Sequence, residues 1–329
     1  MGPMFRPILN PVLRLLDWLG AQGTRAIALS LFVGMALPPL SAVMKPLIPH
    51  AVFLLLVTAF TRVDAEAVWR RLSRPWLVIA VVGWMMVVLP LGFGALLHVS
   101  GIATWEPGIL IAFVLMASAP PIMSSPGITY LLGLDGALSL TILVAALVVT
   151  PVLCPLVIDM LVGAMLPVSS LDLAVRLAGL LGGSLVVAAI LRLLMGRARI
   201  EASSRVFDGA NVVLLFVFAV AIMDGVAARL IADPLLVLGF LAAAIAIALV
   251  FIVGSALVFR FTGLDPSITI GVSCGNRNMA LMAAALASVI PDISWIFFAI
   301  AQVPIYVLPW MMKPVVERIV RPAPVELPE

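Results

Sequence analysis

Long apolar blocks alternate with short polar connections along this chain. A membrane-spanning helix needs about 20 apolar residues to cross about 30 Å of hydrocarbon, and most of the blocks have that length. The pattern therefore predicts ten transmembrane helices and an all-α polytopic membrane protein. The predicted spans are residues 26–44, 47–61, 75–97, 107–133, 136–158, 173–194, 207–224, 234–259, 266–290 and 293–312.

Residues 1–25 have a different pattern. Between residues 12 and 19 apolar positions recur at helical spacing, with Arg14 and Asp17 between them. An amphipathic helix of this kind lies in the membrane interface. The segment has neither the uninterrupted apolar core nor the small-residue cleavage site of a signal peptide. We therefore expect an N-terminal interfacial segment.

Composition and charge agree with a membrane protein of defined orientation. The chain is 64% hydrophobic and 11% charged, whereas a soluble domain is about half apolar and about a quarter charged. With ten spans, 15 of the 19 Lys and Arg residues fall on one side, three fall on the other, and Arg277 lies within the membrane. The positive-inside rule then predicts that both termini are cytoplasmic, in the cell (inner) membrane.

The ten spans divide into two halves of five, and an odd number of spans per half gives the halves opposite orientations. The predicted repeats are residues 26–163 and 164–312, followed by a cytoplasmic tail at 313–329. The fourth span of each repeat is interrupted. The interrupting residues are Pro120, Pro121, Ser124, Ser125 and Pro126 in one half, and Gly275, Asn276, Arg277 and Asn278 in the other. Matched interruptions in inverted halves indicate a transporter binding site near the midplane.

Around these interruptions the chain resembles the bile acid:sodium symporter family. The similar stretches are APPIMSSPGITYLLGLDGALSL (119–140) and CGNRNMAL (274–281), and the resemblance covers nearly the whole chain. It implies a core domain of spans three to five and eight to ten, and a panel domain of the other four. It also implies that the two interrupted helices cross within the core, and that the core moves against the panel. Arsenite-efflux and auxin-carrier-like transporters share this fold.

The departures from the family concern sodium binding. The resemblance places Ser273 where sodium-coupled members have a glutamate, and Arg277-Asn278 where they have Gln-Asn. Ser125 is followed by Pro126 instead of asparagine. Two unit positive charges about 4 Å apart repel by about 4 kcal/mol at an effective dielectric of 20, so a guanidinium disfavours Na⁺. The hydroxyls that remain as candidate ligands are those of Ser125, Thr129, Ser139 and Thr141.

Arg277 itself has several interpretations. A lone arginine at the centre of a membrane helix costs about 2.5–3.5 kcal/mol on insertion scales. As a structural cation, it would donate to the carbonyls at half-helix C-termini or to nearby polar side chains. The predicted side-chain partners are Ser273, Asn276, Asn278, Ser124 and Ser125. Alternatively, its planar fork pairs with the carboxylate of an organic anion, or the residue lies at a membrane edge.

Other polar residues are candidates for a cavity between core and panel. Asp208 and Asp224 bracket the short seventh span and are the acids with the best prospect of facing water. Gln302 and Tyr306 are one turn apart in the tenth span. Cys154 and Cys274 lie in apolar segments and indicate neither a disulfide nor a metal site.

The pattern favours a secondary transporter of a small organic anion with weakened or lost sodium dependence. Two alternatives remain open: a sodium-coupled symporter with rebuilt ion sites, and a non-transporting membrane sensor or receptor. No HExxH, paired carboxylates, nucleophile–histidine arrangement or phosphate-binding loop indicates an enzyme. The expected partners are the organic anion and the lipid bilayer, with no nucleic acid. No cofactor is expected; Na⁺ and H⁺ are the candidate coupling ions.

Overall fold

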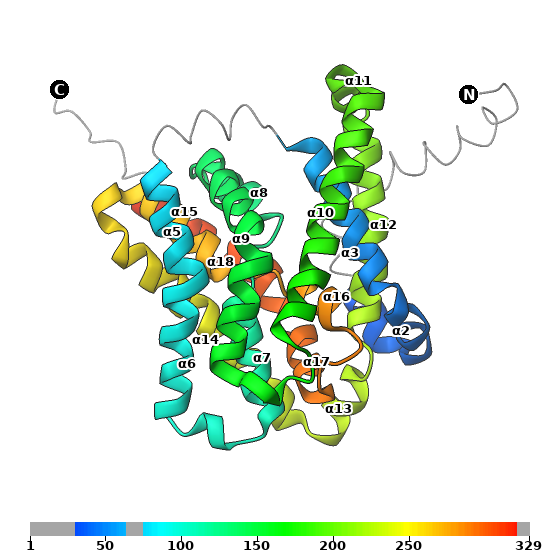
Figure 1. Ribbon diagram of the computed structural model, residues 1–329, viewed down its shortest axis with the longest axis vertical. Coiled ribbons are helices and arrows are strands. Elements are labelled where there is room, and N and C mark those ends of the chain that lie inside the picture. Colours follow the sequence, from blue (N-terminus) through cyan, green and yellow to red (C-terminus); the bar gives the residue numbers. More distant parts are fainter. Residues whose placement is uncertain (1–29, 64–74, 321–329) are drawn as a thin grey trace, which may run out of the picture. The chain divides into compact units, whose positions relative to one another are not determined.

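The computed structural model describes residues 30–63 and 75–320. Every named element in this part is helical (Figure 1), which confirms the all-α prediction. Within residues 30–63 and 75–320, seven helical stretches are long and apolar enough to cross a membrane, as an integral membrane protein requires. They are Pro38–Arg62, Pro75–Val99, Gly136–Met165, Ser170–Met195, Ser204–Ala232, Pro234–Val258 and Asp292–Val320.

Four predicted spans differ from these seven. Spans 107–133 and 266–290 are each divided into two shorter helices. The prediction of a connection near residues 45–46 is wrong, because the chain stays helical from Pro38 to Arg62. The break comes at Leu37, whose backbone leaves the helical region, and Pro38 explains it because a residue before proline disfavours the α conformation. The predicted interfacial segment lies outside the described residues.

The chain divides into two compact units. Among the described residues the first unit comprises 30–63, 175–234 and 283–288, and the second comprises 75–174, 235–282 and 289–320. Helices α10 and α16 contribute residues to both units. Each unit is therefore discontinuous in sequence.

In the first unit, α12 runs antiparallel to α3. Arg62 contacts Asp208 and Thr58 contacts Asn211 along the two helices, and Lys45 of η1 contacts Asp224 just after α12, which gives the reverse order. The helices of this unit are α2 (Pro38–Met44), η1 (Lys45–Leu47), α3 (Ile48–Arg62), α10 (Ser170–Met195), α11 (Arg197–Ala202), α12 (Ser204–Ile222) and α13 (Val226–Ala232).

The second unit contains both interrupted spans. Its first helices are α5 (Pro75–Gly83), the π-helix η2 (Trp84–Val88), α6 (Leu89–Val99), η3 (Ile102–Thr104), α7 (Pro107–Ser118), α8 (Ser125–Leu131), α9 (Gly136–Val162) and η4 (Gly163–Met165). Its later helices are α14 (Pro234–Val258), η5 (Arg260–Thr262), α15 (Leu264–Gly275), α16 (Met279–Leu286), α17 (Asp292–Ile300) and α18 (Gln302–Val320). Since α18 continues to Val320, the helix extends past the predicted boundary at residue 312.

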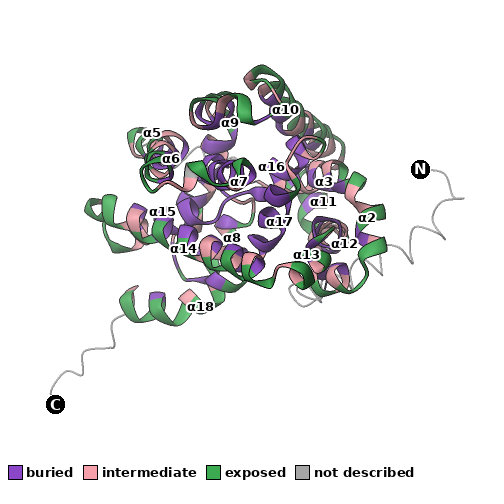
Figure 2. Ribbon diagram, turned by 90° about the horizontal axis from the view of Figure 1, so that it is seen from below, coloured by how far each residue is buried: buried purple, intermediate pink, exposed green. Residues whose placement is uncertain are grey.

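Helices α7 and α17 form the buried centre of the second unit (Figure 2). They pack closely because Gly108 leaves no side chain between them, and the Ser294 hydroxyl donates to the Gly108 carbonyl. The Phe297 ring lies edge-on to Phe113 of α7 and Phe240 of α14. Helix α7, the first half of an interrupted span, is thereby fixed in the interior. The backbone groups at its end are therefore shielded from lipid.

Helix α15 lies against α14 through two glycines four residues apart. A Cβ added at Gly271 would meet the Ile252 carbonyl oxygen at 2.4 Å, and one at Gly275 would meet the Ala248 oxygen at 2.8 Å. Small residues at this spacing let membrane helices approach backbone to backbone. The second half of the crossing is therefore held tightly to a long, unbroken helix.

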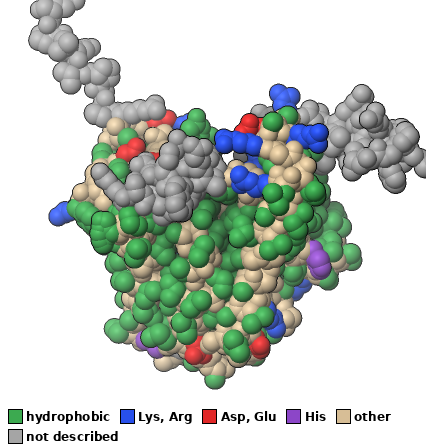
Figure 3. All heavy atoms as spheres, turned by 45° about the horizontal axis from the view of Figure 1, so that its top comes forward, with side chains coloured by type: hydrophobic (Ala, Val, Ile, Leu, Met, Phe, Trp, Pro, Cys, Tyr) green, Lys and Arg blue, Asp and Glu red, His purple; other side chains and the backbone are tan. Residues whose placement is uncertain are grey.

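The exposed faces of the long helices carry large apolar side chains, whereas the corresponding faces of a soluble protein would be polar. Hydrophobic side chains cover much of the face seen in Figure 3. Large apolar residues are exposed along the long helices, for example Val148 and Val152 of α9 and Leu193 of α10. Basic side chains gather at the end of the first unit where α11 carries Arg197 and Arg199. This is the distribution expected for helices that contact hydrocarbon and end at a polar interface.

Candidate functional site at the crossing of two interrupted helices

Both interruptions lie where the sequence predicted them. Helix α7 ends at Ser118 and α8 begins at Ser125, while α15 ends at Gly275 and α16 begins at Met279. Pro120 and Pro121 have no N–H and cannot continue a helix. The residues between the half-helices therefore have backbone groups that need partners elsewhere.

The two interruptions satisfy each other. The Ile122 N–H donates to the Asn276 carbonyl at 2.9 Å, and the Asn278 N–H donates to the Pro120 carbonyl at 2.8 Å. Between these bonds Pro121 and Arg277 form an isolated antiparallel bridge. The two segments are thus joined by two backbone hydrogen bonds inside the second unit. Their polar backbone groups are paired with each other and do not face lipid.

The asparagines at the crossing serve the backbone. Asn276 donates through Nδ2 to the Val272 carbonyl near the end of α15, at 2.9 Å. Asn278 accepts through Oδ1 from the Leu281 N–H in the first turn of α16, at 3.0 Å. Each amide side chain therefore caps one half-helix.

Arg277 is fully buried, with 0% of its surface exposed. Its Nη1 donates to the Ala119 carbonyl at 2.9 Å and the Met85 carbonyl at 3.2 Å, and the guanidinium lies 5.2 Å from the centre of the Phe251 ring. The predicted carbonyl partner is therefore present, at the C-terminal end of α7. The predicted side-chain partners are wrong: none of the five receives a hydrogen bond from the guanidinium in the described part of the chain.

Local chemistry explains why Met85 can accept from Arg277. The segment Trp84–Val88 is a π-helix, and the Leu89 N–H donates to the Trp84 carbonyl five residues back. The next bond in this register would run from residue 90 to Met85, but Pro90 has no N–H. The Met85 carbonyl is left without a donor from its own helix, and Arg277 supplies one.

Two donors of Arg277 remain open. Neither Nε nor Nη2 has an acceptor among the described residues, and both atoms are buried. These two nitrogens share the side edge of the guanidinium, the edge that binds a carboxylate with two parallel hydrogen bonds. In this site Nη1 is hydrogen-bonded to two carbonyls, whereas Nε and Nη2 have no hydrogen-bond partner among the described residues.

A second polar cluster lies beside the crossing. The hydroxyls of Ser125 on α8, Ser139 on α9 and Ser273 on α15 are mutually within 3.0–3.4 Å, and all three residues have no exposed surface. Ser273 also donates to the Thr269 carbonyl. The three contacts within the triangle and the bond to Thr269 share three hydroxyl protons. Each hydroxyl therefore has a hydrogen-bond partner without a bound ion. We call these three residues the hydroxyl triangle.

The triangle continues toward one end of α15. Asp265, Thr269 and Ser273 follow at intervals of four residues on one face of α15, and Arg277 comes four residues later, beyond the end of the helix. The Asp265 carboxylate accepts from the Thr269 hydroxyl and from the backbone N–H of Asp135, both at 3.1 Å. Sequence reasoning missed Asp265, although its spacing from Ser273 and Arg277 was a usable signal.

The remaining predicted residues of the crossing do not join the triangle. The Thr129 hydroxyl donates to the Ser125 and Pro126 carbonyls, and the Thr141 hydroxyl donates to Ala137, all within their own helices. Ser124 is exposed and its side chain does not cap α8. A hydroxyl that is hydrogen-bonded to its own helical turn does not bind a ligand or a neighbouring helix in this structure.

The cavity candidates have local partners. Asp208 and Asp224 pair with Arg62 and Lys45 inside the first unit, so neither acid stands alone. Gln302 is buried and donates to the Phe298 carbonyl. The side chain of Tyr306 lies outside the described part of the structure.

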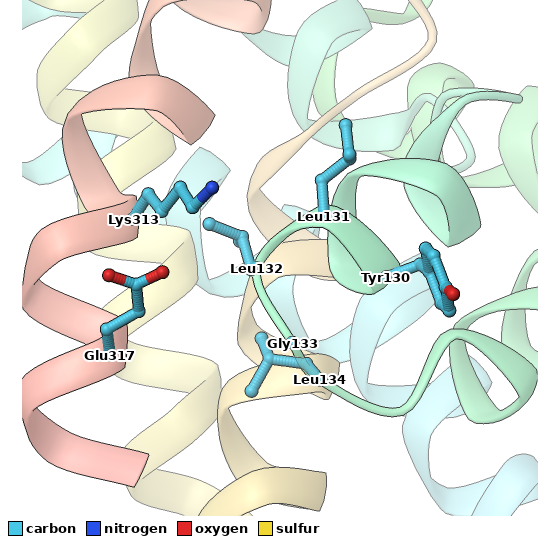
Figure 4. Close-up of a pocket in the computed structure, with 7 residues that line it drawn as sticks. All are labelled: Tyr130, Leu131, Leu132, Gly133, Leu134, Lys313 and Glu317. Atoms are coloured by element: carbon cyan, nitrogen blue, oxygen red, sulfur yellow. The ribbon is translucent and has the colours of Figure 1, made fainter. Parts of the chain in front are cut away.

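A pocket of about 430 Å³ lies at the end of α8 (Figure 4). It is lined by Tyr130, Leu131, Leu132, Gly133, Leu134, Lys313 and Glu317. Lys313 and Glu317 come from α18 and face the turn that follows α8. None of the predicted site residues lines this pocket.

Comparison with protein-family models and with curated proteins finds no match to this chain. The resemblance to the bile acid:sodium symporter family therefore stays a prediction based on the motifs around the two interruptions.

Proposed function

We propose that this protein is a secondary transporter of a small organic anion. The observation that carries the proposal is the reciprocal pairing of the interruption after α7 with the interruption after α15. Discontinuous helices that meet inside a membrane protein form the substrate and ion sites of many transporters. Such irregular backbone is kept only where protein buries it or water reaches it.

The helix pattern supports ten crossings in two inverted repeats. The seven long helices, the two interrupted spans and the first predicted span, of which residues 30–36 are described as helical, would make ten. The proposed repeats have matching elements in the second unit. An unbroken helix (75–99 or 234–258) precedes the interrupted one, and a long helical stretch (136–165 or 292–320) follows it.

The two compact units support a division into two moving parts. The second unit contains most of the residues that the family resemblance assigns to a core, and the first unit contains most of those assigned to a panel; α10 and α16 are shared. We propose that movement of one unit against the other alternates access to the crossing. The proposed membrane is the cell (inner) membrane, with both termini cytoplasmic.

The hydroxyl triangle supports transport without obligatory Na⁺. Its hydroxyls satisfy one another, and no carboxylate is among them to offset the desolvation of a cation. One observation favours the sodium-coupled alternative: three hydroxyl oxygens from three helices converge within 3.4 Å, and Na⁺ binds oxygen ligands. The coupling ion therefore separates the two candidate functions.

Uptake into proteoliposomes tests the proposal. Purified protein is reconstituted and given a mixture of small carboxylic acids and neutral metabolites, with and without Na⁺ and pH gradients. We expect accumulation of one or more organic anions that persists when choline replaces Na⁺. Absence of uptake under every gradient would contradict a transport function, and a steep, saturable Na⁺ requirement would favour the symporter.

A further inference from the structure

We propose that the Nε–Nη2 edge of Arg277 is the binding site for the carboxylate of the transported anion. This inference rests on the proposed function and assigns one chemical group of the substrate to two named atoms. It begins from the unequal use of the guanidinium: Nη1 has two carbonyl acceptors, whereas Nε and Nη2 have none among the described residues.

The guanidinium is held in one orientation before any ligand binds. Nη1 lies between the Ala119 carbonyl of the α7 end and the Met85 carbonyl of the π-helix, and the cation lies over the Phe251 ring. Each carbonyl lacks the helical donor it would otherwise have, because Pro90 follows Met85 in register and prolines follow Ala119. An arginine fixed at one nitrogen loses little freedom when its other edge binds a ligand.

The open edge has the geometry of a carboxylate site. Its two N–H groups are parallel and coplanar, and charge-assisted bonds from such a fork are among the strongest in proteins. A buried cation with two open donors is costly until an acceptor arrives. Among the described residues no Asp or Glu forms an ion pair with Arg277, so the counter-charge is left for a ligand.

A planar anion fits this edge better than a spherical one. A carboxylate offers one oxygen to each N–H, whereas chloride must share a single centre between them. Because Arg277 is fully buried, the ligand enters only when the crossing opens, which the proposed movement of the units provides. The carboxylate would reach Arg277 without displacing Nη1 from its carbonyls.

Acetate binding in Na⁺-free detergent tests the assignment. Thermal melts of the wild type, Arg277→Lys and Arg176→Lys are recorded across a titration of choline acetate, with choline chloride at matched ionic strength. Arg176 is the control because it also donates to a backbone carbonyl, that of Ala285, and belongs to the first unit. General salt effects act on all three proteins and cancel in the comparison.

We expect acetate to raise the melting temperature of wild type and Arg176→Lys more than chloride does. Arg277→Lys keeps the charge but has no fork, so its half-saturation should need at least about tenfold more acetate, a difference of about 1.4 kcal/mol. Equal responses of Arg277→Lys and wild type would overturn the proposal, as would chloride acting as well as acetate.

Pro90→Ala provides a second test that keeps the guanidinium. It gives the Met85 carbonyl a donor from its own helix and so weakens the anchor of Nη1. We expect weaker acetate binding by a few-fold and a folded protein. If Arg277→Lys does not fold and Pro90→Ala binds acetate like the wild type, the proposal fails.

Competition in proteoliposomes separates this inference from the proposed function. Acetate should inhibit uptake of the transported anion by wild type, and excess chloride should not. Arg277-dependent acetate binding without competition would mean a resident anion, and would overturn the assignment to substrate. If no anion is taken up while Arg277-dependent acetate binding remains, transport fails as the function but the binding edge stands.

Discussion

Two polar sites of the second unit, one at Ser273 within α15 and one at Arg277 just after its end, differ in completeness. The hydroxyl triangle at Ser273 joins three helices through neutral groups that satisfy one another. Arg277 carries a full charge, contacts only backbone carbonyls through one nitrogen and leaves a fork open. A closed neutral cluster stabilises the fold without a ligand, whereas a buried cation with open donors has a reason to bind one. This difference is the reason for proposing Arg277 as the ligand-binding residue and the triangle as its structural support.

The largest effect is expected at Arg277 itself. Arg277→Gln removes the donor to the Met85 and Ala119 carbonyls, and each buried carbonyl left unpaired costs about 1–3 kcal/mol, partly offset by removal of a buried charge. We expect a melting temperature lower by several degrees in detergent. Pro90→Ala should recover part of this loss, because it gives Met85 a donor; a double-mutant cycle measures the recovery. Additive effects of the two changes would contradict the anchor.

Gly275 lies between the two sites and tests how tightly α15 is held. A Cβ at Gly275 would lie 2.2 Å from Ile252 Cγ1 and 2.8 Å from the Ala248 oxygen, so Gly275→Ala should cost about 1–3 kcal/mol by overpacking. The control is Gly254→Ala on α14, where a Cβ meets nothing within 4 Å. Thermal melts compare the two variants. Equal melting temperatures would mean that α14 shifts away from the added methyl group at little cost.

Ser273→Ala tests whether the triangle acts as a unit. Ser273 contacts both other hydroxyls and a backbone carbonyl, so its loss should cost about 1–2 kcal/mol. Ser267→Ala on the same helix is the matched control, because that hydroxyl bonds only to the Leu264 carbonyl of its own turn and should cost less than about 0.5 kcal/mol. If the two variants melt alike, the triangle contributes nothing beyond local bonds.

The smallest effect is expected from sodium. Replacing Na⁺ by choline should leave the melting temperature and the uptake rate of the wild type unchanged, because the triangle is complete without an ion. A melting temperature that rises with Na⁺ concentration would mean that a cation binds the folded protein, since such binding stabilises by mass action. That result would make the hydroxyl triangle the ligand-binding site and leave Arg277 with a structural role.

Local chemistry allowed the crossing to be predicted. Pro120, Pro121 and the Gly-Asn-Arg-Asn run each disrupt a helix by themselves, so both interruptions were visible in sequence. Ser125, Ser139 and Ser273 were also identified as candidates. Thr129 and Thr141 were not distinguishable from them, because only rotamers decide whether a hydroxyl bonds to its own turn or across helices.

A carbonyl at a half-helix end was predicted as a partner of Arg277, but the Met85 carbonyl was beyond sequence reasoning. Met85 lies in an apolar run, and nothing in its side chain marks a backbone carbonyl as free. The carbonyl is free only because the π register aligns Met85 with Pro90, and that register depends on tertiary packing. The first connection was also misjudged: Pro46 and Pro49 lie at the starts of η1 and α3, where prolines are tolerated, and the chain stays helical.

The π-helix also constrains how this sequence can change. A chain that lost Arg277 would leave the Met85 carbonyl bare, and restoring an N–H at position 90 would remove that penalty. Conversely, Pro90 is harmless only while a distant donor exists. Substitutions at the two positions should therefore accumulate together, with the cation arriving before the proline. Among related sequences, a non-proline at 90 should accompany a neutral residue at 277 more often than chance allows.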